Sequence, residues 1–389
     1  MKANFEYEQT TKIYFGRGKA AQLPQIAASY GKRILLVTGR KSSSRQKLYE
    51  KILADLRQEG IYAVHYDGVG QNPTTEQVDA GTEIARKEQV EAVIGVGGGS
   101  VLDSAKAIAM AAVNPGKAWD YLFYKTPQPT KTLPVIAVTT TSGTGSQVTQ
   151  VAVITETRTK TKSAVFNNLI YPKAAIVDSE LVQSLPEHIT ASTGFDAFCH
   201  CFESYLHINA SPYTDLVALE GIRMTAKYLE RAVKDGNDLE AREGMAWADT
   251  CGGLAIANAG TTLPHGIGMT ISGHCPSIMH GEALALCYPS FTRLTCKAAQ
   301  EKFAAVGRIL NPGLWQVSQE EAAEQCCDEI DKLLKKIGMW LNFKSFGVDK
   351  EMLKTIALRS HDLPDYRSNP VIADTEEIYR ELLEAYDRT

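Results

Sequence analysis

One carboxylate and three imidazoles are the side chains of this sequence that are best suited to metal chemistry. Asp196 and His200 are four residues apart in a predicted helix, so both side chains lie on one face of it. His265 and His280 come later in the chain, and each is followed by a glycine. One oxygen ligand and three nitrogen ligands suit a divalent transition metal. We therefore predict a metal site formed by Asp196, His200, His265 and His280.

Each of these residues also has an ordinary interpretation. A single Asp in a helix is usually a surface residue, and a single His is usually a hydrogen-bonded core or surface group. Phe195, Phe198 and Phe202 surround the first pair, which predicts that part of this helix is buried. A buried carboxylate requires a partner, and a metal ion provides one.

A glycine-rich turn in the first half of the chain predicts a nucleotide site. Gly97, Gly98, Gly99 and Ser100 follow a predicted strand and precede a predicted helix over residues 101–112. Glycine lets the backbone approach a pyrophosphate, and the helix start offers unpaired N–H groups to the anion. A tight strand-to-helix turn without a ligand is the alternative. A metal and a nucleotide in one chain indicate redox chemistry on an alcohol or a carbonyl.

Further polar residues could complete the nucleotide site. Asp103 and Lys106 are either a helix-surface ion pair or, for Lys106, a contact to phosphate. Residues 139–146 combine hydroxyls and glycines after another predicted strand, which suits a cofactor cradle or a solvated loop. Lys160 and Lys162 could add positive charge, or form an exposed charged stretch.

The residues after the first clear strand bear on cofactor choice. Gly39 is followed by Arg40 and Lys41, and no acid occupies this place. Sites selective for NAD often place an acid at the adenine ribose, whereas an Arg accommodates the additional phosphate of NADP. If this loop faces the adenosine, NADP(H) is favoured; the alternative is a loop that is merely basic.

Composition excludes several classes of partner. The 389 residues carry a formal net charge of −4 and no long basic run, which argues against nucleic acid. No apolar stretch reaches the roughly 18 residues of a membrane helix, and the N-terminus lacks the apolar core of a signal peptide. We expect a cytoplasmic protein that binds no membrane. The eight cysteines lack the C-x-x-C spacing of zinc sites and are expected to be reduced packing residues.

The chain divides into two halves of different pattern. Apolar runs at residues 34–37, 92–96, 134–138 and 174–177 predict buried parallel strands, with helices over residues 44–58 and 75–88 between them. Long helical segments follow near residues 191–208, 212–234, 238–258, 317–337 and 375–388. We predict an α/β dinucleotide-binding domain over residues 1–185 and an all-helical metal-binding domain over residues 186–389.

At this point the motifs match a known family. The chain resembles the iron-containing (group III) alcohol dehydrogenases, which have the dehydroquinate-synthase-like fold. The similarity runs nearly end to end and is carried by the segments Ile13–Gly18, Gly97–Lys106, Thr140–Ser146, Gly194–His200, Pro264–Gly266, His280–Ala283 and Asn369–Pro370. With a glycine at position 39, the chain resembles the NADP-using subgroup of this family, which contains aldehyde reductases and butanol dehydrogenases.

The resemblance implies a cofactor, a metal and a set of contacts. Iron(II) is the expected metal, with zinc as the alternative, held by the Asp and three His named above. The cofactor-contacting positions match Asn72, Gly98, Gly99, Ser100, Thr140, Thr141, Thr149, Lys162 and Leu181. A homodimer is also implied, with the segment Lys12–Phe15 as a plausible contact. Two departures are Met269, where many relatives carry a proton-relaying His, and Gln147, where a Glu is usual.

The predicted function is a metal-dependent, NAD(P)(H)-linked alcohol dehydrogenase or aldehyde reductase. Hydride would pass between nicotinamide and a short-chain primary alcohol or aldehyde. His274, in a predicted exposed loop, is a candidate for proton transfer. The alternatives are a polyol or hydroxy-acid dehydrogenase, a dehydroquinate-synthase-like lyase, and a non-catalytic metal- or nucleotide-binding protein.

Overall fold

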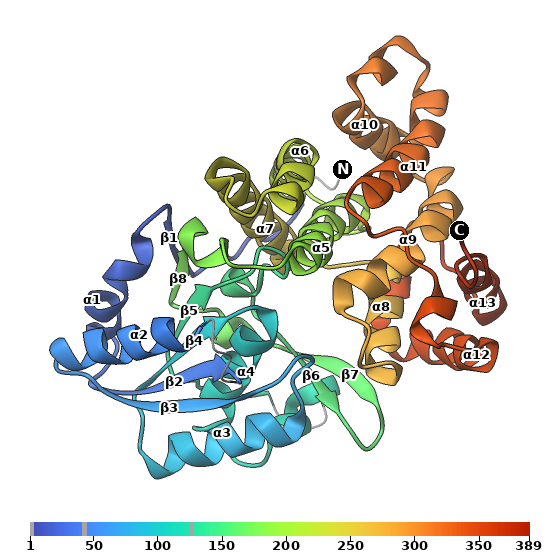
Figure 1. Ribbon diagram of the computed structural model, residues 1–389. Helices are drawn as coiled ribbons and strands as arrows, with labels where there is room; N and C mark the ends of the chain where they lie inside the picture. Colours follow the sequence, from blue (N-terminus) through green and yellow to red (C-terminus); the bar gives the residue numbers. More distant parts are fainter. Residues whose placement is uncertain (1–3, 41–44, 125–127) are drawn as a thin grey trace. The chain divides into compact units, whose positions relative to one another are not determined.

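The chain folds into an α/β unit and a helical unit. The computed structural model describes residues 4–40, 45–124 and 128–389. Residues 8–184 form the α/β unit, and residues 185–389 form the helical unit together with the first residues up to Tyr7. In Figure 1 the α/β unit is coloured from blue to green, and most of the helical unit is coloured from green to red. The predicted fold class, a nucleotide-type α/β domain followed by a helical domain, is confirmed.

A six-stranded sheet with only parallel pairings forms the centre of the α/β unit. In spatial order its strands are β1 (Lys12–Phe15), β8 (Ala174–Val177), β5 (Val135–Thr139), β4 (Ala92–Gly97), β2 (Arg33–Gly39) and β3 (Tyr62–Val69). The four predicted apolar runs form β2, β4, β5 and β8. The sequence analysis did not predict β3, whose side chains are mostly half-buried because it lies at the edge.

Alternate side chains of the sheet enter different cores. Ile34 and Leu36 of β2 pack with α1 (Leu23–Ala28) and α2 (Gln46–Gln58). Leu35 and Val37 pack with α3 (Thr75–Lys87) and α4 (Gly99–Ala111). Because both faces of the sheet are covered, its inner strands β2, β4, β5 and β8 contain continuous apolar runs instead of an alternation of apolar and polar residues.

The strand order reverses direction between β2 and β4. The chain moves outward from β2 to β3 and then returns past β2 to β4 and β5. In open α/β sheets, ligands bind outside the carboxyl ends of the strands at such a switch point. Thr38 pairs with Val96 across these two strands, so Gly39 and Gly97 end them at the same level.

A separate hairpin was not predicted. It consists of β6 (Val151–Glu156) and β7 (Thr161–Phe166), which pair antiparallel. Ala152, Ile154 and Val165 pack into the same core as α4. A two-stranded ribbon needs such tertiary packing to be stable.

Nine α-helices form the described helical unit: α5 (Glu187–Leu206), α6 (Pro212–Lys234), α7 (Leu239–Asn258), α8 (Leu263–His274), α9 (His280–Cys296), α10 (Gln300–Leu310), α11 (Gln319–Lys336), α12 (Lys350–Arg359) and α13 (Thr375–Glu384). The predicted segments correspond to α5, α6, α7, α11 and α13. The sequence analysis missed α8, whose glycines lower helix propensity, and also α9, α10 and α12. Tertiary packing overrides local propensity here: Ile267, Ile271 and Leu286 are fully buried in one core.

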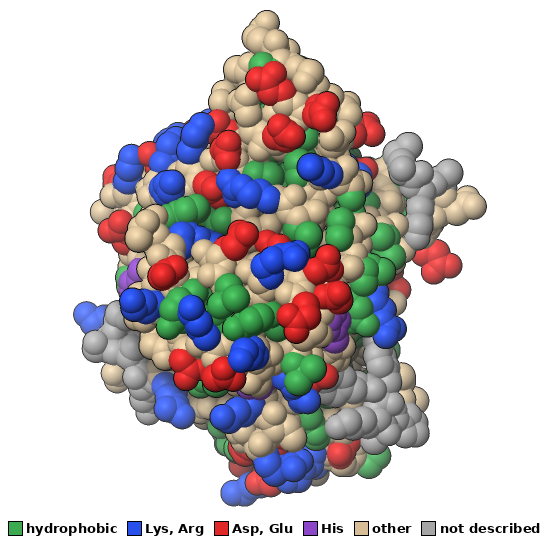
Figure 2. Space-filling model, turned by 90° about the vertical axis from the view of Figure 1, so that its right-hand side faces the viewer, with side chains coloured by type: hydrophobic (Ala, Val, Ile, Leu, Met, Phe, Trp, Pro, Cys, Tyr) green, Lys and Arg blue, Asp and Glu red, His purple; other side chains and the backbone are tan. Residues whose placement is uncertain are grey.

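The surface carries both signs of charge. On the face drawn in Figure 2, Lys and Arg side chains are interspersed with Asp and Glu, as expected from the small net charge. None of the helices in the described part of the chain has the length and apolar character to cross a membrane. The eight cysteines form no disulfide with one another, and all except the half-buried Cys275 are buried, as predicted for packing residues.

Candidate metal centre and cofactor-binding residues

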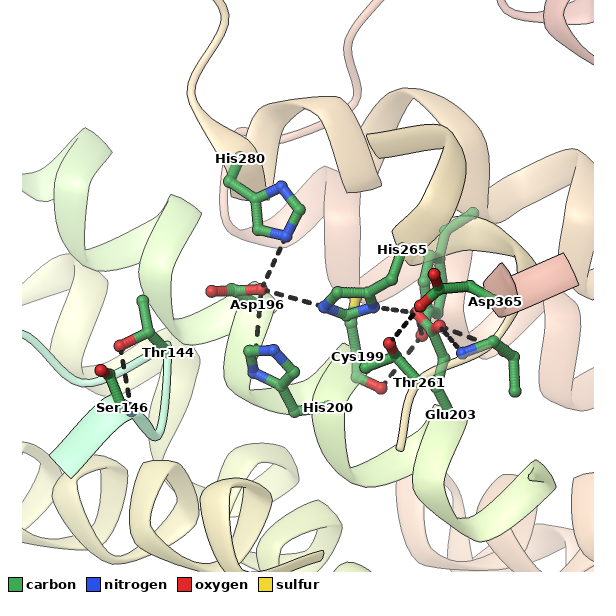
Figure 3. Close-up of polar contacts among 12 residues, drawn as sticks. Thr144, Ser146, Asp196, Cys199, His200, Glu203, Thr261, His265, His280 and Asp365 are labelled. Atoms are coloured by element: carbon green, nitrogen blue, oxygen red, sulfur yellow. Dashed lines mark hydrogen bonds and ion pairs between the residues drawn. The ribbon is translucent and has the colours of Figure 1, made fainter. Parts of the chain in front are cut away.

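The four predicted metal ligands come together in the helical unit. Figure 3 shows the imidazoles of His200, His265 and His280 directed toward the carboxylate of Asp196. Asp196 Oδ1 lies 3.8 Å from His200 Nδ1, 3.6 Å from His265 Nε2 and 3.9 Å from His280 Nε2. Three helices supply them: α5 carries Asp196 and His200, α8 carries His265, and α9 begins at His280.

Two facing atoms of this cluster are buried and have no hydrogen-bond partner within the part of the chain that the structure describes. These are Asp196 Oδ1 and His265 Nε2, which face each other at a distance too long for a hydrogen bond. Leaving buried polar atoms unpaired costs free energy unless something else satisfies them. A metal ion would satisfy both atoms at once, and carboxylate oxygen with imidazole nitrogen is a suitable donor set. Asp196, His265 and His280 each offer a ligand atom within 4.8 Å of the others.

The electrostatics of the cluster favour positive charge. Burial alone would raise the pKa of Asp196, but the facing histidines lower it to about 2. Burial would lower the pKa of His265, but the carboxylates of Glu203 and Asp196 outweigh this effect and raise it to about 10. The same two carboxylates that stabilise a proton here would also stabilise a divalent cation.

A second carboxylate, which was not predicted from the sequence, lies beside the cluster. Glu203 is fully buried in α5, and one of its oxygens lies 2.6 Å from His265 Nδ1. The same carboxylate accepts from the backbone N–H of Thr262 at 2.8 Å and from the Tyr288 hydroxyl at 3.1 Å. Its spacing of seven residues from Asp196 places both on the same face of the helix, a signal that could have identified it.

Close helix packing fixes the position of His280. The next residue, Gly281, lies against α5, and a Cβ built on it would stand 2.0 Å from the backbone oxygen of Ser192. Backbone cannot yield as a flexible side chain can, so only glycine allows α9 to begin this close to α5. The glycine after the third histidine therefore positions that histidine relative to Asp196.

His274 lies apart from the cluster. It is the last residue of α8, nine residues after His265, which corresponds to about 13 Å along a helix axis. Its Nδ1 lies 3.1 Å from the carbonyl of Thr270, a contact within its own helix. Proton transfer by His274 remains a prediction.

Most of the predicted cofactor contacts lie at the carboxyl ends of the strands in the α/β unit. Gly39 ends β2, Gly97 ends β4, and Thr140 follows β5 and donates its N–H to the Gly97 carbonyl. Ser100 lies in the first turn of α4 and Leu181 in the 3-10 turn after β8. The remaining predicted contacts lie in loops or in the hairpin: Asn72, Thr141, Thr149 and Lys162. Asn72 accepts a hydrogen bond from Lys162 at 3.0 Å.

The three glycines at residues 97–99 pack against residues 140–149, which we call the threonine loop. A Cβ on Gly98 would lie 2.9 Å from Thr141, and a Cβ on Gly99 would lie 2.5 Å from Thr144. These glycines are therefore required by packing within the protein itself. Among the described residues, no side chain forms a capping hydrogen bond at Gly98, the residue before α4. The first turn of α4 thus keeps the backbone donors that can bind an anion.

Of the two interpretations of Lys106, the structure has the ion pair with Asp103, with a buried ammonium instead of one on the helix surface, and not the phosphate contact. Its ammonium is fully buried and donates to the carbonyls of Ser146, Thr149 and Val151. Asp103, 3.4 Å from this ammonium, accepts from the Ser146 hydroxyl at 2.5 Å and the Val153 N–H at 3.0 Å. Lys106 and Asp103 of α4 thus both bind the threonine loop and hold it in place. Asp103 therefore stabilises the loop that carries several of the predicted cofactor contacts.

Arg45 is a cation that the sequence analysis did not single out. It precedes α2 and donates to the side-chain and carbonyl oxygens of Thr140. Arg40 is exposed at the end of β2, whereas Lys41 lies outside the described residues. Positive charge therefore lies near the carboxyl ends of β2 and β5.

A doubly wound sheet and a helical unit with a carboxylate–imidazole cluster together define a metal-dependent, nucleotide-linked class of enzyme. Comparison with known families makes the class specific. Residues 10–179 match the model for "iron-containing alcohol dehydrogenase", and residues 190–386 match that for the C-terminal part of the "Fe-containing alcohol dehydrogenase family". The chain belongs to this family, and its activity is that of a metal-dependent, NAD(P)-linked alcohol dehydrogenase.

Individual relatives agree with this assignment. An NAD-dependent methanol dehydrogenase of Bacillus methanolicus is 33% identical, with 93% of this chain and 95% of the relative covered. An NADPH-dependent butanol dehydrogenase of Clostridium saccharobutylicum is 31% identical over 88% of this chain and 87% of the relative. The crystal structure of an archaeal alcohol dehydrogenase from a Red Sea brine pool superposes with a TM-score of 0.94. It is 32% identical and covers 99% of this chain and 100% of its own.

Proposed function

We propose that Asp196, His200, His265 and His280 hold one catalytic divalent metal, iron(II) in preference to zinc. The observation that carries the proposal is the pair of buried, unpaired atoms, Asp196 Oδ1 and His265 Nε2, facing each other among three imidazoles. When bound, a divalent metal supplies a Lewis acid that stabilises negative charge on the oxygen of an alcohol or aldehyde. Burial of the cluster excludes water from around this charge, which strengthens the electrostatic interaction.

We further propose that the carboxyl edge of the parallel sheet binds NADP(H). The glycine turn and the first turn of α4 would receive the pyrophosphate, because backbone N–H groups there lack a side-chain cap. Thr140 and Thr141 would line the same edge of the sheet. Their loop is held in place by the contacts of Lys106 and Asp103 with Ser146. The hydride transfer itself is the chemistry of the nicotinamide. The expected substrate is a short-chain primary alcohol or its aldehyde.

A matrix of cofactors and substrates tests this function. Protein prepared without oxygen is loaded with iron(II) or zinc and assayed with NADPH and NADH over a panel of short-chain aldehydes. We expect oxidation of the reduced nicotinamide that depends on both metal and aldehyde. Absence of turnover over the whole panel, in protein shown to contain metal, would reject the proposed substrate class.

The absence of an acid at Gly39 predicts that charge at this position controls cofactor choice. Among the described residues, a Cβ at Gly39 would approach the Val101 side chain and the Val69 carbonyl, each at 3.8 Å, which is ordinary van der Waals contact and leaves room there for a side chain. In Gly39→Asp, we expect the ratio of kcat/KM for NADPH to that for NADH to fall about tenfold or more, since the anion would repel the 2′-phosphate. Steady-state kinetics with both cofactors measures this ratio.

The uncharged variant Gly39→Asn is the matched control. It adds a side chain of nearly the same size without the charge, so its cofactor ratio should remain near that of the wild type. An equal change in both variants would assign the effect to volume, and no change in either would place Gly39 away from the adenosine.

We propose that the enzyme is a homodimer. β1 is the last strand at one edge of the sheet, and edge strands present backbone groups on which a second copy can pair. Light scattering coupled to size-exclusion chromatography should give twice the mass of the chain, and a monomer mass would reject the proposal.

We also propose a cytoplasmic location. Eight cysteines without a disulfide among them suit a reducing compartment, where disulfides do not form. Fractionation of the source cells should recover the activity with cytosolic markers.

A further inference from the structure

The carboxylate of Glu203 is surrounded by hydrogen-bond donors. Oε1 faces His265 Nδ1 at 2.6 Å and accepts from the Tyr288 hydroxyl at 3.1 Å. Oε2 accepts from the Thr262 backbone N–H at 2.8 Å and from the Thr262 hydroxyl at 3.1 Å. Glu203 and its contact with His265 are drawn in Figure 3.

The contact with Glu203 determines which nitrogen of His265 carries a proton. An ionised carboxylate only accepts hydrogen bonds, so the facing Nδ1 must be protonated. In the neutral ring, Nε2 then keeps its lone pair, and it is Nε2 that lies 3.6 Å from Asp196 Oδ1. The lone pair is thereby directed to the place proposed for the metal.

We propose that Glu203 is a positioning residue for the metal centre: it fixes the tautomer and the ring orientation of His265. The inference rests on the proposed function, because it assigns Glu203 a role toward the proposed metal ligand. A carboxylate that binds the outer nitrogen of a metal-ligating histidine also makes that ligand more basic. Glu203 itself does not touch the reacting atoms.

A carboxylate is needed because every neighbour donates. Glutamine has nearly the same shape, but one of its two terminal atoms is a donor. If its NH₂ faced Thr262, two N–H groups would oppose each other. If it faced His265, it would favour the tautomer with the proton on Nε2, where the metal is expected. Either orientation disturbs an arrangement in which Glu203 is fully buried.

A purely structural role is the competing explanation. Glu203 also ties the start of α8 to α5 through the Thr262 backbone, and its loss could merely loosen the two helices. Variants of its other partners separate the two explanations. Tyr288→Phe removes a hydrogen bond to the same carboxylate oxygen without touching His265, and Thr262→Val removes one hydroxyl contact.

The experiment compares metal affinity in Glu203→Gln, Tyr288→Phe, Thr262→Val and the wild type, by competition of the full-length protein with a chelator for zinc. We expect Glu203→Gln to bind zinc 10- to 100-fold more weakly, and the other two variants to stay within a few-fold of the wild type. In cobalt(II)-loaded protein, the visible spectrum should change shape only in Glu203→Gln. Circular dichroism checks that each variant is folded.

The outcomes separate the two proposals. Wild-type protein that binds no metal would overturn both the proposed function and this inference. Wild-type protein that binds zinc while Glu203→Gln binds it equally well would overturn only the role of Glu203. Equal weakening in all variants would also overturn it, in favour of a structural role. If Glu203→Gln does not fold, Glu203→Asp replaces it: its shorter side chain keeps the charge but draws it back from His265, and an unchanged affinity would again overturn the inference.

Discussion

Replacing His280 by alanine is expected to remove the metal and to lower kcat/KM by about a thousandfold or more. Lewis-acid stabilisation of charge on a substrate oxygen contributes several kcal/mol, and each 1.36 kcal/mol corresponds to a factor of ten in rate. The His280 side chain is 22% exposed, more than Asp196 or His265, so its truncation leaves little buried volume empty. Elemental analysis and steady-state kinetics on the same preparation measure both effects.

His188→Ala is the matched control for this variant. His188 is exposed in the first turn of α5, the helix that also carries Asp196 and His200. Its removal should change neither metal content nor turnover. A His280→Ala protein with full metal content and no activity would mean that His280 acts on the substrate instead. Retention of both properties would exclude it from the centre.

Short-range spacing predicted part of the site. Asp196 and His200 are one helical turn apart, and the flanking aromatic residues predicted that their helix is buried, as observed. The glycine turn was predicted between β4 and α4, because continuous apolar runs and glycines are local signals. Such features depend only on residues that are close in sequence.

Long-range packing decided the rest. Glu203 lies on the same helical face as Asp196, but its contact with a predicted metal ligand depends on His265, which comes 62 residues later in the chain. The start of α9 depends on the approach of Gly281 to Ser192, which no local pattern of the sequence predicts. α8 was missed because its glycines and proline argue against a helix, whereas its buried isoleucines stabilise one.

Lys106 shows why charge alone misleads. A lysine near a glycine turn suggests a phosphate contact, because isolated charges are rarely buried. Almost all of α4 is buried, however, between the sheet and the β6–β7 hairpin. The hairpin was not predicted, so the loop carbonyls that surround the ammonium were not foreseen either.

Replacing Lys106 by methionine is expected to destabilise the α/β unit by about 3–5 kcal/mol, because the half-buried partner Asp103 and several loop carbonyls lose their buried cation. The exposed pair Lys51–Asp55 is the contrast: its atoms are closer, at 2.5 Å against 3.4 Å, but Lys51→Met should cost less than about 1 kcal/mol. Burial, and not distance, determines which pair matters. Urea unfolding, followed by circular dichroism, measures both variants.

The pH dependence provides a second test of Lys106. Burial lowers the pKa of Lys106 from 10.5 to about 8, against the opposing attraction of Asp103. Below pH 8, Lys106 is protonated in both the folded and the unfolded state, so its contribution does not vary with pH. Between pH 8 and 10.5, Lys106 is protonated to a larger extent in the unfolded state than in the folded state. Titration of this group therefore increases the free energy of unfolding of the wild type as pH rises. Methionine does not titrate, and the stability difference between wild type and Lys106→Met should therefore widen over this range. A difference that stays constant or narrows would show that the ammonium is not held in the buried position.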